Sequence, residues 1–143
     1  MYGMNRTDLS SEQKSKKIQH FLDLATQHHK AGNLPKAKGI YRKILQDDPN
    51  QPVALHLLGV IAYQAGKHEQ AIEYITRALH IKPDYAEAHN NLGTVLKELG
   101  HVDDAISQHR NSLSIKPDFA EAHSNLGVAL QIQGNLDKAI ASY

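Results

Sequence analysis

The stretch Ile81–Gly93 reads IKPDYAEAHNNLG, and the stretch Ile115–Gly127 reads IKPDFAEAHSNLG. Pro83 and Pro117 are 34 residues apart, and Pro49 lies another 34 residues back. A fixed period between about 20 and 50 residues is typical of proteins built from stacked structural repeats. The chain is therefore predicted to be a repeat array, which buries its core between neighbouring units and not in one centre.

Other positions keep the same period, and each row of equivalent residues holds one kind of side chain. Two rows hold small residues, one row holds leucine and one row holds glycine. The rows are Leu24, Leu58, Leu92 and Leu126; Ala25, Gly59, Gly93 and Gly127; Gly32, Gly66, Gly100 and Gly134; and Ala37, Ala71, Ala105 and Ala139. We number repeat positions so that the leucine row is position 7, which places position 1 at residues 18, 52, 86 and 120.

These rows resemble the tetratricopeptide repeat (TPR), a family of helix–turn–helix units. The resemblance runs from about Ile18 to the last residue and is strongest from Gln51 to Tyr143. It implies an all-α fold, a right-handed superhelical solenoid of TPR hairpins. A second and weaker resemblance, in KPDFAEAHSNLG and the closing AIASY, is to the TPR arrays of O-GlcNAc-transferase-type proteins.

The chain divides into an N-terminal extension and the array. Residues 1–17 are predicted to be the extension, with Met1–Leu9 disordered and a helix beginning near Ser10, since Ser10 and Gln13 can form a capping box. The TPR array is predicted over residues 18–143, as repeats of about 18–51, 52–85, 86–119 and a truncated 120–143. The glycine row should end each first helix in left-handed backbone. First helices are then predicted near residues 51–64, 85–99 and 119–133, and second helices near 67–81, 102–115 and 135–143.

The fourth repeat is incomplete in this sequence. Position 24 is Tyr143, and positions 27, 28 and 32 have no residue. A helix interrupted there cannot bury its apolar stripe, and terminal repeats normally carry a polar capping helix. We expect either that the sequence is a fragment of a longer protein or that another chain covers this surface, through self-association of the unfinished repeat.

Composition argues against several classes of protein. The chain has 143 residues, a formal net charge of +1 and no cysteine. No nucleic-acid or membrane partner is predicted from so small a charge, and disulfides and thiolate chemistry are excluded. The start, MYGMNRTDLSSEQKSKK, lacks the apolar core of a signal peptide, and no segment approaches the roughly 20 apolar residues of a membrane helix. A cytoplasmic location is the resulting expectation.

Ten histidines raise the question of a metal site. His89 and His123 share position 4 on separate helices, whose axes lie about 8–10 Å apart when packed. That separation is too large for two ligands about 2 Å from one zinc ion, so we interpret this pair as packing residues. No phosphate-binding loop or other catalytic motif is present. No metal, cofactor or catalytic site is expected in these residues, while a catalytic domain beyond residue 143 is compatible with the sequence.

The remaining candidate site is a surface. In the TPR family the concave face is lined by first helices at positions 2, 5, 6, 9, 12 and 13. Asn91 and Asn125 both occupy position 6, and a primary amide donates and accepts at once, so the pair can bind an extended peptide backbone. Alternatively, both are ordinary consensus asparagines satisfied within the protein. The candidate partner-binding residues are Leu57, Val60 and Tyr63 in an apolar half, and Asn90, Asn91, Thr94, Lys97 and Asn125 in an amide-rich half.

The sequence predicts a protein–protein interaction scaffold that binds a peptide or partner segment in the concave TPR groove. Chaperone-binding TPR proteins clamp a carboxylate with Lys and Arg at positions 5 and 9, and no strong cation stands there in this chain. The alternative is the N-terminal substrate-recruiting TPR region of a longer enzyme, such as an O-GlcNAc-transferase-like glycosyltransferase. Two expectations follow from the pattern. Asn91 and Asn125 should bind without supporting the fold, and His109, at position 24, should be buried without a partner, so that His109→Tyr stabilises.

Overall fold

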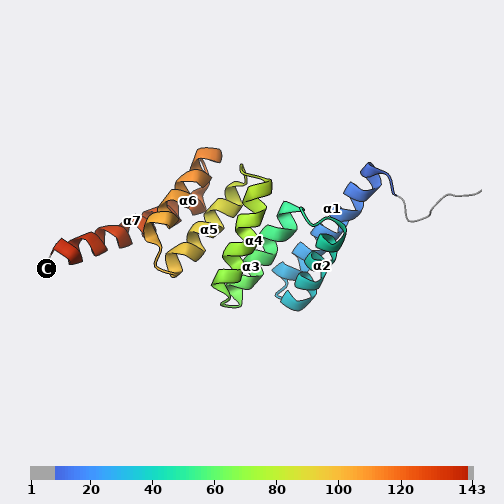
Figure 1. Cartoon of the computed structure of the whole chain (residues 1–143), viewed down its shortest axis with the longest axis horizontal. Coiled ribbons are helices and arrows are strands. Elements are labelled where there is room, and N and C mark those ends of the chain that lie inside the picture. The colour runs from blue at the N-terminus through green and yellow to red at the C-terminus, as the bar shows by residue number, and fades with distance from the viewer. Residues whose placement is uncertain (1–8, 142–143) are drawn as a thin grey trace, which may run out of the picture.

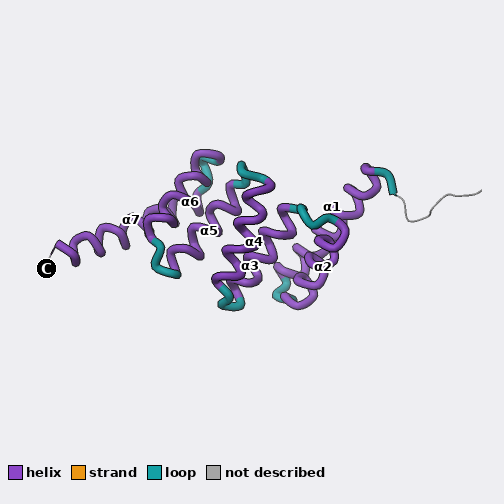
Figure 2. The backbone as a smooth tube through the Cα atoms, viewed as in Figure 1, coloured by secondary structure: helices purple, strands orange, loops and turns teal. Residues whose placement is uncertain are grey.

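Seven α-helices and no strand make up residues 9–141, which are the residues that the computed structural model describes (Figure 2). The all-α prediction is confirmed. Among these residues, no helix is both long and apolar enough to cross a membrane. Most of the segment predicted to be disordered, and Tyr143, lie outside the described residues. The helices are α1 (Ser11–Lys30), α2 (Leu34–Asp47), α3 (Pro52–Gln64), α4 (His68–Ile81), α5 (Ala86–Glu98), α6 (Val102–Ile115) and α7 (Ala120–Ala141).

Side chains cap the first helices of the first two repeats. The Ser10 hydroxyl oxygen accepts the Gln13 backbone N–H at 3.1 Å, and the Gln13 side chain accepts the Ser10 backbone N–H at 3.0 Å. This reciprocal pair is a capping box, which confirms the predicted start of α1. At α3, the side chain of Gln51 takes the capping role and accepts the Val53 N–H at 2.7 Å. In both cases a backbone donor that the helix leaves unpaired finds an acceptor.

The turn within each hairpin depends on a glycine. Gly66 has φ of 78°, and the N–H of the next residue, Lys67, reaches back to the carbonyl of Ala62 at 2.8 Å. Gly32 and Gly100 have φ of 81° and 87° in the same setting. A side chain is strained in this left-handed region, whereas glycine adopts it at little cost. The predicted glycine turns are confirmed at these three positions.

The helices form hairpins that stand in a row along the long axis of the molecule (Figure 1). The pairs α1–α2, α3–α4 and α5–α6 follow one another, and α7 packs on the last of them. The apolar core is accordingly divided among the junctions, as expected for a solenoid. Its three clusters centre on Leu22, Tyr41 and Leu58; on Ile75, Leu92 and Val95; and on Val102, Ile106 and Ala129.

The last helix differs from the prediction. α7 continues without a break through Gly134, so the predicted pair of helices on either side of that residue is wrong (Figure 1). The described chain beyond Gly134 is only seven residues long, and its two large apolar side chains, Leu136 and Ile140, stay 51% and 72% exposed. A short helix folded back from these residues would bury too little surface to offset the cost of ordering a turn. Self-association through this end stays a prediction, which light-scattering masses at two concentrations test.

Candidate protein-binding groove

A hollow of about 230 Å³ lies between the first helices of consecutive repeats. Its walls come from α3, α5 and α7, and Ile75 of α4 also contributes. Five of the eight predicted partner-binding residues line it, from both the apolar half and the amide-rich half, and their role in binding stays a prediction. The lining residues, which define what we call the groove hollow, are Val60, Tyr63, Gln64, Ile75, Asn91, Thr94, Val95, Glu121 and Asn125.

The other three predicted residues lie elsewhere. Leu57 is half-buried against the core cluster that α1, α2 and α3 share. Lys97 is half-buried on α5, outside the lining of the groove hollow. Asn90 is only 1% exposed, so its prediction as a groove-surface residue is wrong. Its side-chain oxygen, Oδ1, lies within hydrogen-bond distance of both His109 and Asn125. Asn90 is therefore a buried residue that connects these two side chains.

Asn91 forms a hydrogen bond across the junction between repeats. Its Nδ2 donates to His56 Nε2 at 2.7 Å, and the other ring nitrogen, Nδ1, lies 2.9 Å from the Tyr85 hydroxyl. His56 is 4% exposed, and burial lowers its pKa to about 4. The ring is therefore neutral at pH 7, with Nε2 as acceptor and Nδ1–H as donor to Tyr85. Both ring nitrogens are satisfied, and the orientation of the Asn91 amide is fixed.

Asn125 is held in an equivalent way. Its Nδ2 donates to Asn90 Oδ1 at 3.1 Å. Asn91 and Asn125 thus each use one N–H for a bond to the preceding repeat, which argues against the expectation that they do not support the fold. A primary amide has two N–H groups and a carbonyl oxygen, so each residue keeps one N–H and its oxygen for a ligand.

His109 has the partner that the sequence did not reveal. It is 0% exposed, and its Nδ1 donates to Asn90 Oδ1 at 2.9 Å, while no hydrogen bond is made by Nε2. Burial lowers its pKa to about 4. The ring lies against Gly93, where an added Cβ would come within 2.6 Å of it. The prediction of a partnerless His109 is wrong, and His109→Tyr is expected to destabilise because it removes the bond to Asn90.

A step of 35 residues, one more than the repeat period, joins neighbouring first helices. The four side-chain pairs link position 5 to position 6 of the next repeat, or position 12 to position 13. The pairs are His29–Gln64 (2.8 Å), His56–Asn91 (2.7 Å), Tyr63–Glu98 and Asn90–Asn125 (3.1 Å). Equal positions of consecutive repeats do not reveal this offset pairing. Complementary polar residues one position apart in consecutive repeats were the available signal.

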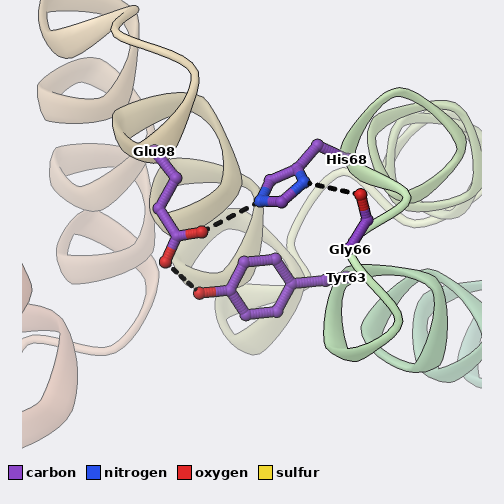
Figure 3. A network of polar contacts seen from close by, with 4 residues as sticks. All are labelled: Tyr63, Gly66, His68 and Glu98. Atoms are coloured by element: carbon purple, nitrogen blue, oxygen red, sulfur yellow. Dashed lines mark hydrogen bonds and ion pairs between the residues drawn. The ribbon is translucent and has the colours of Figure 1, made fainter.

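One rim of the groove face carries a cluster of ionisable groups (Figure 3). Glu98 accepts from the Tyr63 hydroxyl and from His68 Nε2, the latter at 2.9 Å, and His68 Nδ1 lies 3.1 Å from the Gly66 carbonyl. The Glu98 hydrogen bond raises the pKa of Tyr63 to about 12. The same carboxylate raises the pKa of His68, and its two donors lower its own pKa. The cluster ties the end of α5 to the turn between α3 and α4.

The position-4 histidines form hydrogen bonds to the turn before their own helix, and the interpretation of the pair as packing residues is wrong for His123, which is exposed. His89 Nε2 and His123 Nε2 lie 2.8 Å and 2.7 Å from the carbonyls of Pro83 and Pro117. Each ring thereby satisfies the turn that leads into its own helix. No group of three or more His, Asp or Glu suited to a metal ion occurs in the described residues.

Comparison with solved structures places this hairpin row among known repeats. A mutant of the O-GlcNAc transferase of Thermobaculum terrenum matches at 31% identity and a TM-score of 0.80, over 86% of this chain and 23% of that chain. The chain thus spans about a quarter of that protein. A crystal structure of MamA matches at 27% identity and a TM-score of 0.74, over 87% of this chain and 72% of that chain. The first TPR of Spaghetti (RPAP3), bound to an HSP90 peptide, matches at 21% identity and a TM-score of 0.77, over 84% of this chain and 95% of that one.

Family comparison agrees with the structures. No curated protein gives a significant sequence match. A family model described as a tetratricopeptide repeat matches residues 28–90 and 62–108, and one described as a TPR repeat matches residues 93–134. Both repeat families support a protein-interaction scaffold, a fold typical of non-catalytic modules. With its hairpin row and more than half of its length matched, the chain belongs to the tetratricopeptide repeat family.

Proposed function

We propose that the chain binds an extended peptide segment of a partner protein along α3, α5 and α7, with the groove hollow at the centre of the contact. The observation that carries this proposal is the placement of Asn91 and Asn125 in one hollow together with the apolar side chains of Val60 and Val95. Ligand sites commonly combine an apolar wall with a few polar groups of fixed orientation. This hollow has both.

The polar chemistry suits a peptide backbone. Asn91 and Asn125 each keep a carbonyl oxygen and one N–H after the bonds to His56 and Asn90. A backbone amide group also offers one donor and one acceptor, so an asparagine can pair with it whatever the peptide's side chains. Because the amides are already held by the preceding repeat, little side-chain entropy is lost on binding.

Peptide-array selection followed by titration tests the proposal. The full chain is screened against blocked nonapeptides, and the best peptide is titrated by fluorescence anisotropy at a temperature well below the melting transition. Asn91→Ala with Asn125→Ala should weaken binding roughly ten- to thirtyfold, since each lost hydrogen bond contributes about 1 kcal/mol. Glu73→Ala, an exposed change on α4, should leave the affinity unchanged.

Other outcomes assign the site differently. If the asparagine variant binds normally while Val60→Ala loses binding, the apolar half alone is the site. If neither change affects a peptide that binds, the groove proposal fails, and another face of the array is the interface.

A second candidate is favoured by one comparison. The chain resembles part of an O-GlcNAc transferase at 31% identity over 86% of its own length. The proposal is that these repeats are the substrate-recruiting region of a longer glycosyltransferase. The coding sequence after Tyr143 tests it, because the absence of a glycosyltransferase domain there would exclude this role.

A further inference from the structure

Glu121 is the only ionised side chain among the described residues that line the groove hollow, and none of those residues is basic. It is exposed in the first turn of α7, and within the described part of the chain it has no hydrogen bond or ion pair. Lys97 belongs to the same face but lies outside the lining. The hollow therefore has a full negative charge with no internal counter-charge.

The hydroxyl groups of the hollow have no hydrogen to offer a ligand. Thr94 Oγ1 donates to the backbone carbonyl of Asn90 at 3.2 Å, and the Tyr63 hydroxyl donates to the Glu98 carboxylate. A hydroxyl has a single hydrogen and two lone pairs. Both groups are therefore left as acceptors.

The asparagine amides in the lining have also used part of their donor capacity within the protein. Asn91 and Asn125 each give one N–H to the preceding repeat and keep the whole carbonyl oxygen. Gln64 is the exception, since its oxygen lies 2.8 Å from His29 Nε2 and its NH₂ group stays free. Counted with Glu121, acceptors predominate in the lining.

The rest of the lining is apolar. Ile75 and Val95 are buried at 0% and 1% exposure and border the hollow beside Val60 and the ring of Tyr63. Lysine and arginine bury an aliphatic stem along apolar surface while their charged end seeks polar partners. An aromatic ring near a cation adds a further attraction.

We propose that the groove hollow is a subsite for a basic side chain, lysine or arginine, which places its stem against Val60 and Val95 and its cationic end at Glu121, Asn91 and Asn125. The inference rests on the proposed function, in which that side chain belongs to the bound peptide. An ammonium carries three donors and a guanidinium five, which matches a lining rich in acceptors. An acidic side chain would meet Glu121, and a purely aliphatic one would leave the acceptors unpaired.

Blocked amino acids test the subsite without any peptide. The full chain is titrated by NMR with the N-acetyl methylamides of lysine, arginine, norleucine and glutamate. Lysine and arginine should shift the backbone amide signals of Val60, Asn91 and Thr94, norleucine should do so more weakly, and glutamate should not. Norleucine is the matched probe because it keeps the lysine stem and lacks the charge.

Two isosteric variants identify the carboxylate responsible. Glu121→Gln should weaken lysine binding about two- to fivefold, the range of an exposed ion pair. Glu73→Gln, an exposed carboxylate on α4, should change nothing. Equal binding of norleucine and lysine, or unchanged lysine binding by Glu121→Gln, overturns the subsite.

The peptide array separates this failure from failure of the proposed function. Peptides that need Asn91 and Asn125 but show no preference for lysine or arginine overturn the subsite and leave the groove proposal standing. Lysine binding to the hollow, together with an array in which no peptide binds, overturns the groove proposal and leaves the cation preference standing.

Discussion

Asn91 and His56 belong to different repeats and are joined by a hydrogen bond of 2.7 Å from Asn91 Nδ2 to His56 Nε2. The same histidine contacts the Tyr85 hydroxyl through its other nitrogen, at 2.9 Å. Asn91, which the sequence predicts to serve only a ligand, therefore also connects two units of the array. Folding and binding share this side chain, and experiments on either have to separate the two.

A double-mutant cycle measures that connection. Asn91→Ala and His56→Ala should each lower the free energy of unfolding. The double variant should lose less than the sum by about 0.5–1.5 kcal/mol, because the bond can be lost only once. Urea unfolding supplies the four values. As a control, Asn91→Ala and Glu73→Ala should be additive within about 0.5 kcal/mol, and equal additivity in both cycles would contradict the bond.

Gly93 and Gly127 occupy the same repeat position with different surroundings. A Cβ at Gly93 would lie 2.6 Å from the His109 ring, whereas a Cβ at Gly127 would meet nothing within 4 Å. Gly93→Ala should therefore destabilise by about 1–3 kcal/mol through overpacking. Gly127→Ala should stabilise α7 by up to about 1 kcal/mol, because alanine is the better helix former. Thermal unfolding compares the two, and a neutral Gly93→Ala would mean that the ring moves aside freely.

The glycine row offers a second matched pair. Gly100 has φ of 87°, while Gly134 lies inside α7 and has no positive φ. Alanine at position 100 should cost roughly 1 kcal/mol, since a side chain is strained there. Alanine at position 134 should stabilise by up to about 1 kcal/mol. If the melting temperature instead falls for both variants, Gly134 is also a turn, and the continuous α7 is wrong.

The buried histidines predict acid sensitivity. The pKa values of His56 and His109 are lowered to about 4 by burial, against about 6.5 in an unfolded chain. Between these values the unfolded state binds more protons, so stability falls as the pH decreases from about 6.5 to about 4. Each histidine can account for a few kcal/mol of this loss. His68, whose pKa is raised by its hydrogen bond to Glu98, acts in the opposite direction, and its contribution is small because solvent reaches this ion pair and screens it.

Urea unfolding at pH 7 and at about pH 4.5 measures this dependence. His56→Gln cannot titrate in this range, so its stability should change less between the two conditions than that of the parent protein. The same pH dependence in both proteins would show that His56 does not contribute.

The end of α7 should open more readily than the middle of the array. Leu136 and Ile140 are largely exposed, whereas Leu55 and Leu58 of α3 are buried. Local opening follows the number of buried contacts that must be broken. Backbone amides of residues 135–141 should therefore exchange with deuterium faster than those of residues 54–63, as measured by NMR. Equal protection of both segments would show that α7 has partners beyond those it contacts here.

Periodicity predicted the fold because it records packing directly. The rows of Leu92 and Gly93 repeat in the sequence since each hairpin presents the same face to its neighbour. The position-6 asparagines were found in the same way, and they line the groove hollow. Features that every unit repeats were therefore accessible from the sequence.

Features that depend on one particular neighbour were not accessible. Asn90 occupies a position predicted to face the groove, yet its side chain is buried and forms a hydrogen bond with His109. The continuous α7 was missed because a glycine permits a left-handed turn without requiring one. In both cases the local pattern was interpreted correctly, and the outcome depended on which side chains were available to pack against it.

The side-chain bonds between repeats also differ in number from one junction to the next, which bears on the stiffness of the array. The middle junction, between the second and third repeats, has His56–Asn91 and, two helical turns away, the bonds of Glu98 to Tyr63 and His68. The junction after it has Asn90–Asn125 and a bond of 2.7 Å from Gln133 to Asp103, whereas the junction before it has His29–Gln64. Two bonds at different points along a helix pair resist rotation of one repeat against the next, whereas a single bond leaves that rotation freer. We therefore expect the first repeat to change its angle to the rest of the array more readily than the later repeats, so that an elongated partner would adjust the curvature at the N-terminal end.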